Sequence, residues 1–315
     1  MKYTQFTLKP LENVGVEIGD FDINASFSEE LQAELKHAWY EHAIMVFRGQ
    51  SITPVRQIEF SRLFGPLELH PLKVKTSETN PELFVLENGG DADAYQTAFF
   101  NGEEIVGRLD WHMDLHYTGK PNHGAVLRAL TVADKDGLTG FGDLAMAYDA
   151  LSDELKERIK DIEVAYRFEM QRTKWRFVDN THYQPGPNSP KKPSDIGFPD
   201  FDDSVYPAVV THPISGRKVL EIVEQFLHRV IDPASVGMSS NEADRLLEEL
   251  VEHTRKPEFH YWHDWQEGDM VLWDNWRAMH CTSGTPPGIK RLINRTTIEG
   301  DIQLGRQLAT KKTID

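Results

Sequence analysis

The stretch Trp111-His112-Met113-Asp114 places an imidazole and a carboxylate two residues apart. Residues two apart on a β-strand point to the same face, so His112 and Asp114 can reach one metal ion without distortion of the backbone. A distant histidine, His280, can complete three ligands. Two imidazoles and one carboxylate leave one face of an octahedron open, which is the arrangement of non-haem Fe(II) oxygenases. The sequence therefore predicts that distant strands of one β core meet at a metal site.

The His112/Asp114 pair is a weak signal by itself, because the chain has 13 histidines and such pairs often lie at a surface or in a core. The segment after His280 strengthens it. A Gly/Pro-rich loop, 281–288, is followed by the strand-like run 291–298. This hairpin is expected to return Arg291 to the side of His280, with Arg291 and Arg295 on one face of the strand. A guanidinium binds a carboxylate through two hydrogen bonds, so an arginine beside a metal suits a dicarboxylate such as 2-oxoglutarate.

These residues resemble the TauD/TfdA family of Fe(II)- and 2-oxoglutarate-dependent dioxygenases. The resemblance covers nearly the whole chain, because several motifs that occur in the same order in this family are spread along it. Besides those quoted above, they are Phe64-Gly65-Pro66-Leu67-Glu68-Leu69-His70-Pro71, Thr211-His212-Pro213-Ile214-Ser215-Gly216-Arg217-Lys218 and Trp265-Gln266-Glu267-Gly268-Asp269.

The resemblance implies ligands and cosubstrates. His112, Asp114 and His280 would bind Fe(II) and form the catalytic centre, with O2 as the second cosubstrate. Arg291 would hold the distal carboxylate of 2-oxoglutarate. Thr139 matches, by its spacing to His112, the threonine that assists this arginine. The Thr139 segment, Gly137-Leu138-Thr139-Gly140-Phe141, lacks the acidic residue that usually precedes the threonine.

Five residues are candidates for contact with the primary substrate. Arg295 matches the arginine that binds the acidic group of the substrate in similar enzymes, so a small or medium organic anion is expected; the side chain could instead pair with a structural carboxylate. His70 matches a substrate-contacting histidine, and Lys73 follows it closely; both could simply be exposed. Arg108 could meet an anionic substrate or form a surface ion pair. Phe226 could line the pocket or pack in the core.

Composition favours a soluble enzyme with one domain. The proposed ligands are far apart in the 315-residue chain, so one continuous core, residues 1–315, has to bring them together. We find no apolar run of about 20 residues and no signal-peptide pattern at the start, and we therefore expect a cytoplasmic protein without membrane contact. The single cysteine, Cys281, excludes an internal disulfide and is interpreted as a packing residue.

The formal net charge of −16 argues against nucleic acid as a partner, since phosphate binding needs a basic surface. An arginine-bearing pocket is compatible with this charge because pocket chemistry is local. The expected partner is a small molecule, and a homo-oligomer is compatible with the sequence.

Strand-like runs alternate with turns and inserted helices, an α+β pattern around a β core. The resemblance narrows this to a double-stranded β-helix, or jelly roll, with helical insertions. The predicted strands are 14–18, 43–47, 83–86, 125–130, 219–222, 270–273 and 292–298, and the predicted helices are 28–42, 54–63, 147–151, 152–159 and 240–253.

Residues 179–203 are predicted to form an insertion loop, because 184–193 contains four prolines together with Gly186, Asn188 and Ser189 and cannot easily form regular structure. Such loops often act as lids over a site, and a surface loop is the other interpretation.

Two other classes of protein could use the same ligands. A cupin-type metal protein, acting as an isomerase or a small-molecule binder, would not consume 2-oxoglutarate and would not need Arg291. A zinc hydrolase can also use two histidines and a carboxylate with an open coordination position. Neither class explains the ordered motifs that follow His280.

Overall fold

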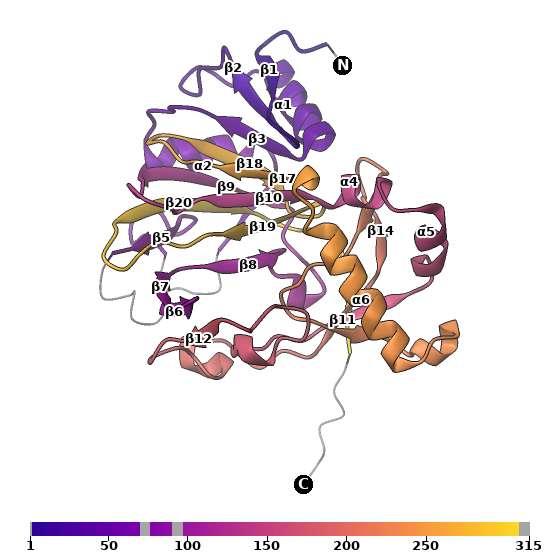
Figure 1. Cartoon of the computed structure of the whole chain (residues 1–315). Coiled ribbons are helices and arrows are strands. Elements are labelled where there is room, and N and C mark those ends of the chain that lie inside the picture. Colours follow the sequence, from indigo (N-terminus) through magenta and orange to yellow (C-terminus); the bar gives the residue numbers. More distant parts are fainter. Residues whose placement is uncertain (1, 70–75, 90–96, 309–315) are drawn as a thin grey trace.

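The computed structural model describes residues 2–69, 76–89 and 97–308. Within these ranges the protein is a mixed α/β structure with many strands and few helices (Figure 1). The helices are α1 (Glu29–His42), α2 (Pro54–Arg62), α4 (Leu144–Asp149), α5 (Asp153–Ile159) and α6 (Ser240–Thr254), and the 3-10 turns are η2 (His116–Thr118), η3 (Arg172–Lys174), η4 (Pro193–Ile196), η5 (Pro233–Val236) and η6 (Pro257–Phe259). None of the helices in these ranges is long and apolar enough to cross a membrane.

Most strands are short, and they are numbered in the order of the chain. They are β1 (Thr7–Pro10), β2 (Val16–Gly19), β3 (Ile44–Phe47), β4 (Leu67–Glu68), β5 (Phe84–Asn88), β6 (Thr97–Phe100), β7 (Glu103–Val106), β8 (Leu109–His112), β9 (Gly124–Thr131), β10 (Thr139–Asp143), β11 (Glu163–Tyr166), β12 (Tyr183–Pro185), β13 (Ser204–Pro207), β14 (Val209–Thr211), β15 (Lys218–Leu220), β16 (Leu227–Val230), β17 (His260–His263), β18 (Met270–Asp274), β19 (Ala278–Thr282), β20 (Arg291–Ile298) and β21 (Arg306–Gln307).

The helices begin where side chains can cap them. The Ser28 hydroxyl accepts a hydrogen bond from the backbone N–H of Leu31 at 3.1 Å, so α1 starts at the predicted position. Ser239 and Glu242 form a capping box at the start of α6. The predicted helices overlap α1, α2, α4, α5 and α6, and each predicted strand overlaps an observed one, so the expected α+β pattern is confirmed.

Two sheets carry the site. The larger one has the order β1-β2-β3-β18-β9-β20-β4, with β5 also paired to β20, and the smaller one has the order β17-β10-β19-β8. One apolar cluster joins them: Phe141 of β10 and Tyr261 of β17 pack with Leu127 of β9 and Trp273 of β18. The sheets therefore share a core, and the smaller sheet ends at β8 (Figure 1).

The segment 179–203 is more regular than its composition predicts. Its residues 183–185 form β12, which pairs antiparallel with β6, and residues 193–196 form η4. The prolines stand at the end of the short strand and at the first position of the 3-10 turn, where no backbone N–H is needed. The prediction that this stretch lacks regular structure was therefore too broad.

Candidate metal and 2-oxoglutarate site

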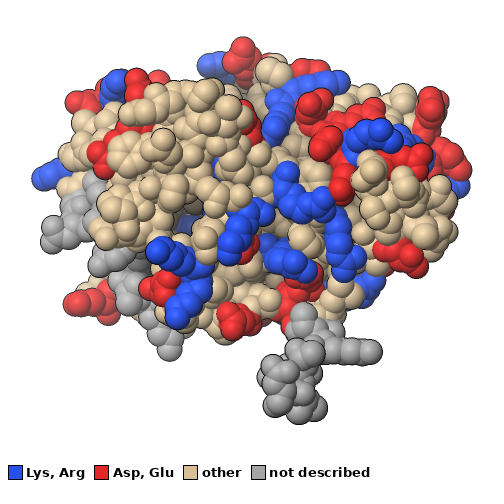
Figure 2. All heavy atoms as spheres, turned by 60° about the horizontal axis from the view of Figure 1, so that its bottom comes forward, with Lys and Arg blue, Asp and Glu red and all other residues tan. Residues whose placement is uncertain are grey.

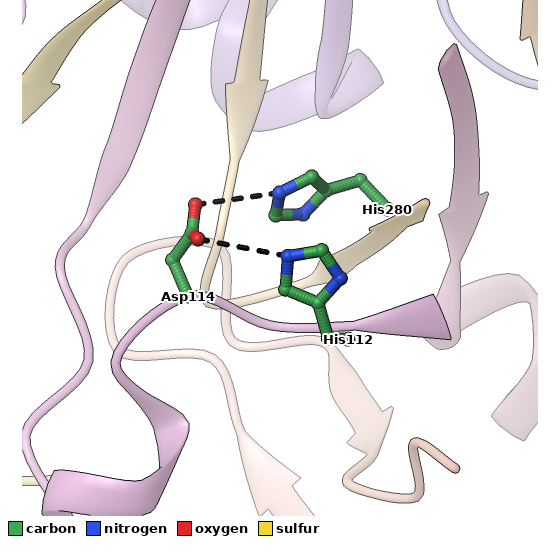
Figure 3. A group of neighbouring side chains, drawn as sticks. All are labelled: His112, Asp114 and His280. Carbon is green, nitrogen blue, oxygen red and sulfur yellow. Dashed lines mark ion pairs between the residues drawn. The ribbon is translucent and has the colours of Figure 1, made fainter. Parts of the chain in front are cut away.

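Strands β8 and β19 bring the three predicted ligands together. His112 is the last residue of β8 and is paired in register with His280 of β19. Asp114 follows two residues later and lies beside the two neighbouring imidazoles, with His112 Nε2 3.7 Å from Oδ1 and His280 Nε2 3.4 Å from Oδ2 (Figure 3). The ligand atoms all lie within 4.8 Å of one another. This spacing suits a single metal ion held by three side chains.

Both histidines are prepared to offer a lone pair. The Nδ1 of His112 donates to the backbone carbonyl of Asp110 at 2.8 Å, because a carbonyl can only accept. Its proton is therefore on Nδ1, and Nε2 is free to face Asp114. Burial lowers the pKa of His280 well below its usual value, and repulsion from His112 adds to the effect. A neutral imidazole is the form that binds a metal.

Asp114 is held as a carboxylate. Burial by itself raises the pKa of Asp114, but the charge of Arg295 and the nearby N–H-bearing rings of His280 and His112 outweigh it, and the pKa lies well below the usual range. Arg295 Nη2 is 2.8 Å from Asp114 Oδ2. The side chain of Asn275, just before the His280 strand, fixes the Asp114 backbone by accepting from its N–H at 2.9 Å and donating to its carbonyl at 3.0 Å. Sequence reasoning missed Asn275.

Arg291, Thr139 and Trp265 form a second polar group beside the sheets. Arg291 is only 8% exposed, and its Nη2 donates to the Thr139 hydroxyl at 3.4 Å. Trp265 Nε1 donates to the same hydroxyl at 2.9 Å. In the part of the chain that the structure describes, no acidic side chain pairs with Arg291, and burial lowers its pKa to about 10. A buried guanidinium without a counterion is unfavourable unless a ligand supplies the negative charge.

An aromatic cluster lies next to Asp114. Tyr117 belongs to this cluster and lies in η2, three residues after Asp114, and burial together with the charge of Asp114 raises the pKa of its phenol. Phe226 packs near Tyr117 at a ring distance of 6.0 Å and against Phe168 at 5.0 Å. These rings are only partly buried, unlike those of the core. We call the following residues the aromatic cluster: Tyr117, Phe168, Trp175, Phe198, Phe201 and Phe226.

Sequence reasoning identified Phe226 but missed the other members of the aromatic cluster. The signal that could have found them is the number of aromatic residues between 168 and 201, a stretch that otherwise looks like polar loop. Their spacing follows neither a strand nor a helix period, so only the fold shows that they converge.

Arg108 lies apart from the three ligands. Its guanidinium stacks over the ring of Phe100 at 4.3 Å and is 4.0 Å from Asp110. It lines a cavity of about 400 Å³ together with Trp111 and Cys281. Trp111 and Cys281 are the strand neighbours of His112 and His280, so this cavity is on the reverse face of β8 and β19. Of the two interpretations of Arg108, contact with an anionic substrate or a surface ion pair, its distance to Asp110 agrees with the ion pair.

His70 and Lys73, the other two substrate candidates, lie outside the described residues. Cys281 is buried, and burial raises the pKa of its thiol, which agrees with a packing role.

A second group of three side chains could be mistaken for a metal site. His123, His212 and Asp274 are all buried and have ligand atoms within 4.8 Å of one another. However, His212 Nδ1 accepts hydrogen bonds from the backbone N–H groups of residues 214 and 215. The proton of neutral His212 must then be on Nε2, which donates to Asp274 at 2.9 Å. No lone pair of His212 remains for a metal, so we assign this group a structural role.

Comparisons with known proteins agree with this geometry. The profile of the family described as "Taurine catabolism dioxygenase TauD, TfdA family" matches residues 7–297. The (S)-phenoxypropionate/alpha-ketoglutarate-dioxygenase of Sphingobium herbicidovorans is 31% identical over 287 residues, which are 91% of this chain and 90% of the relative. The alpha-ketoglutarate-dependent 2,4-dichlorophenoxyacetate dioxygenase of Cupriavidus pinatubonensis is 30% identical over 93% of this chain and 96% of its own.

A solved structure shows the same fold. The crystal structure of a taurine dioxygenase from Burkholderia xenovorans superposes with a TM-score of 0.72 and 24% sequence identity. The superposition covers 96% of this chain and 94% of that one.

Proposed function

Because the chain belongs to the TauD/TfdA family, it is a 2-oxoglutarate-dependent dioxygenase, and we propose that it oxidises a small or medium organic anion that carries an aromatic or other apolar body. We propose that His112, Asp114 and His280 bind Fe(II), and that Arg291 with Thr139 binds the distal carboxylate of 2-oxoglutarate. The oxidation is a hydroxylation, which can be followed by loss of a heteroatom group from the hydroxylated carbon.

The observation that carries this proposal is the combination of the three ligands with an unpaired arginine. The donor set fits Fe(II), because two neutral imidazoles and one carboxylate converge with the Nε2 of His112 free. Arg291 is buried without an acidic partner among the described residues, as a binding group for an anion should be. Neither a cupin-type isomerase nor a zinc hydrolase requires such an arginine.

Each side chain has a task that follows from its position. Bound Fe(II) supplies O2 activation coupled to the oxidative decarboxylation of 2-oxoglutarate to succinate and CO2. Asp114, kept ionised by Arg295, balances the charge of the metal ion. Arg291 and the Thr139 hydroxyl orient the cosubstrate from its far end, and Trp265 fixes that hydroxyl. Because a carboxylate occupies the position that a halide would need, halogenation is disfavoured.

The substrate proposal rests on Arg295 and the aromatic cluster. Arg295 pairs with Asp114 through one nitrogen, while its buried Nε–H has no acceptor among the described residues. An acidic group of the substrate can accept from this guanidinium, and the half-buried rings around Tyr117 can contact an apolar body. The relatives that act on phenoxypropionate and 2,4-dichlorophenoxyacetate support an aryloxy acid as the first class to test.

Surface charge supports an anionic substrate as well. The chain carries a formal net charge of −16, yet Lys and Arg side chains form a band across the face that is at the bottom of Figure 1 (Figure 2). A local basic band can attract anions even on an acidic protein.

Several finer features of the protein belong to the same proposal. We propose that the two sheets with their shared core form a double-stranded β-helix, and that residues 1–315 fold as a single domain. Residues 179–203 cover the site as a lid in this scheme, because their Phe198 and Phe201 pack against Phe168 in the aromatic cluster. A cytoplasmic location and the absence of nucleic acid as a partner remain part of the proposal.

The experiment that tests this function measures succinate formation with Fe(II), ascorbate and 2-oxoglutarate. A panel of aryloxy acids, alkyl sulfonates and the matching neutral amides serves as primary substrates. We expect aryloxy acids to stimulate succinate formation and to yield a hydroxylated or cleaved product. Equal turnover of the neutral amides would contradict the proposal that the substrate is an anion. If no succinate forms with any compound of the panel, nor in the reaction without a primary substrate, the proposed oxygenase activity is contradicted.

A further inference from the structure

His112 lies on an edge strand, β8, which has few pairing contacts within its sheet. Strand β8 is the last strand of the smaller sheet and pairs within it only with β19, through His280 with His112 and Thr282 with Leu109. The four residues 109–112 of β8 therefore lie opposite the three residues 280–282 of β19, which is a β-bulge. A regular strand would place Asp110 on the face of His112. With the bulge, Asp110 lines the cavity on the reverse face instead.

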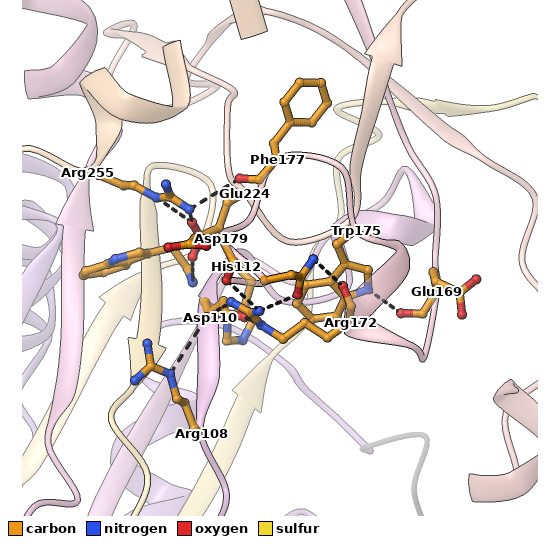
Figure 4. A network of polar contacts seen from close by, with 12 residues as sticks. Arg108, Asp110, His112, Glu169, Arg172, Trp175, Phe177, Asp179, Glu224 and Arg255 are labelled. Carbon is orange, nitrogen blue, oxygen red and sulfur yellow. Dashed lines mark hydrogen bonds and ion pairs between the residues drawn. The ribbon is translucent and has the colours of Figure 1, made fainter. Parts of the chain in front are cut away.

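Contacts at the free edge of β8 replace a neighbouring strand. The backbone N–H of Trp111 donates to Glu224 Oε1 at 3.1 Å, and its carbonyl accepts from the N–H of Gln225 at 3.2 Å. Arg255 pairs with Glu224 from the other side (Figure 4). These contacts fix Trp111, but they leave Asp110, whose carbonyl orients the His112 ring, to another partner.

That partner is Arg172. Its Nε is 2.6 Å from Asp110 Oδ2 and its Nη2 is 3.3 Å from Oδ1, and both side chains are about nine-tenths buried. Its remaining nitrogen, Nη1, donates to the carbonyl of Asp179 at 3.0 Å and to the side chain of Asn180 at 2.7 Å (Figure 4). One guanidinium therefore joins the metal-bearing strand to the segment that begins at residue 168 and ends at residue 201. A two-pronged bond of this kind fixes orientation as well as distance.

The ion pair of Arg172 with Asp110 lies beside a cavity. The cavity of about 400 Å³ lies between β8 and the segment, because Asp110 and Trp111 line it on one side and Arg172 and Tyr183 on the other. Trp111 of β8 and Phe177 of the segment also pack in one apolar cluster, so the ion pair adds a contact of fixed orientation to this packing. The same segment carries four members of the aromatic cluster: Phe168, Trp175, Phe198 and Phe201.

We propose that Arg172 is a positioning residue for the metal site: by binding Asp110 it fixes the bulged edge of β8, and with it the His112 imidazole, relative to the segment that carries the aromatic cluster. Arg172 contacts neither the metal nor the substrate. It keeps the metal ligand and the substrate-binding rings in one fixed arrangement. This inference rests on the proposed function, because it requires a metal at His112, Asp114 and His280.

The test is the affinity for Mn(II), measured without oxygen from the electron paramagnetic resonance signal of free Mn(II). We expect Arg172→Met to weaken Mn(II) binding by about 10-fold, the lower end of the effect of removing a direct partner of a metal ligand, because Arg172 acts on His112 through Asp110. Arg172→Lys should restore part of the affinity, because the charge remains while the planar fork is lost. The matched control is Arg176→Met, since Arg176 is on the same segment and pairs with Asp244 at 2.7 Å at the surface; its Mn(II) affinity should stay within twofold of wild type.

The outcomes separate this inference from the proposed function. If wild type binds no Mn(II), the proposed function fails and the positioning role fails with it. If wild type binds Mn(II) and Arg172→Met binds it equally well, only the positioning role is overturned. An equal loss in Arg176→Met would show a general effect on folding and would also overturn it. If Arg172→Met does not fold, Asp110→Asn carries the same test, because it keeps the size of the side chain and weakens the same contact.

Discussion

Replacing Arg291 with leucine should weaken binding of 2-oxoglutarate strongly. The Arg291 side chain is 8% exposed and has only the Thr139 hydroxyl as a partner among the described residues. A bound carboxylate would therefore be the only counterion of the guanidinium. Removing one partner of a buried, charged hydrogen-bonded pair costs about 2–5 kcal/mol. At about 1.4 kcal/mol per factor of ten, the dissociation constant should rise by roughly 30-fold to several thousand-fold.

The same change should make the unliganded protein more stable. Burial lowers the pKa of Arg291 from 12.5 to about 10, which corresponds to about 3 kcal/mol against the charged form. The folded-state pKa lies below the unfolded one, so stability rises with pH only between these two values. At pH 7, below both pKa values, the destabilisation by the buried charge of Arg291 is present in full. Since an apolar replacement of a buried charge often stabilises by about 1–4 kcal/mol, we expect a gain of about 1–3 kcal/mol without ligand.

Two assays test the Arg291 prediction. Isothermal titration with 2-oxoglutarate in the presence of Mn(II) gives the affinity, and urea unfolding of the ligand-free protein gives the stability. Arg291→Lys is the matched variant, and it should recover only part of the affinity because lysine lacks the planar fork. Unchanged affinity in Arg291→Leu would place the cosubstrate elsewhere. A clear loss of stability would refute the view that the guanidinium is buried without a counterion.

Three further predictions concern the metal and the substrate. Asp114→Ala should abolish metal-dependent succinate formation, because the carboxylate both binds the metal and balances its charge; full activity in this variant would contradict the ligand assignment. Arg295→Gln should raise the KM for an acidic primary substrate by about 10-fold or more while 2-oxoglutarate affinity changes little, and equal losses of both affinities would argue against substrate recognition. Phe226→Ala should raise the KM for aryloxy acids more than that for short alkyl acids, and a uniform change would place Phe226 in the core only.

Much of this site could be predicted from local sequence because it follows strand geometry. The pair His112 and Asp114 and the distant His280 depend on alternation along strands, and the structure brings these three residues together. The predicted hairpin between the strands of His280 and Arg291 is wrong, because β19 and β20 belong to different sheets and are not paired with each other. The proximity of Thr139 to Arg291 also agrees with its predicted place. Helix starts were predictable for a similar reason, since Ser28 caps α1 through its own hydroxyl.

The features that were missed depend on the fold rather than on a local period. For Arg108 the sequence left two interpretations open, because it would share the face of His112 on a regular strand, whereas the bulge in β8 turns this stretch to the reverse side. The contact of Arg172 with Asp110 joins residues far apart in the chain, and nothing near either residue indicates the other. The aromatic cluster likewise gathers rings from several separate segments.

A crystal structure of the protein with Mn(II) and 2-oxoglutarate, grown without oxygen, tests the central claim most directly. Our account predicts one Mn(II) ion bound by His112, Asp114 and His280, with 2-oxoglutarate chelating it and its distal carboxylate within hydrogen-bond distance of Arg291. Metal bound at His123, His212 and Asp274 instead, or 2-oxoglutarate bound away from Arg291, would contradict the account.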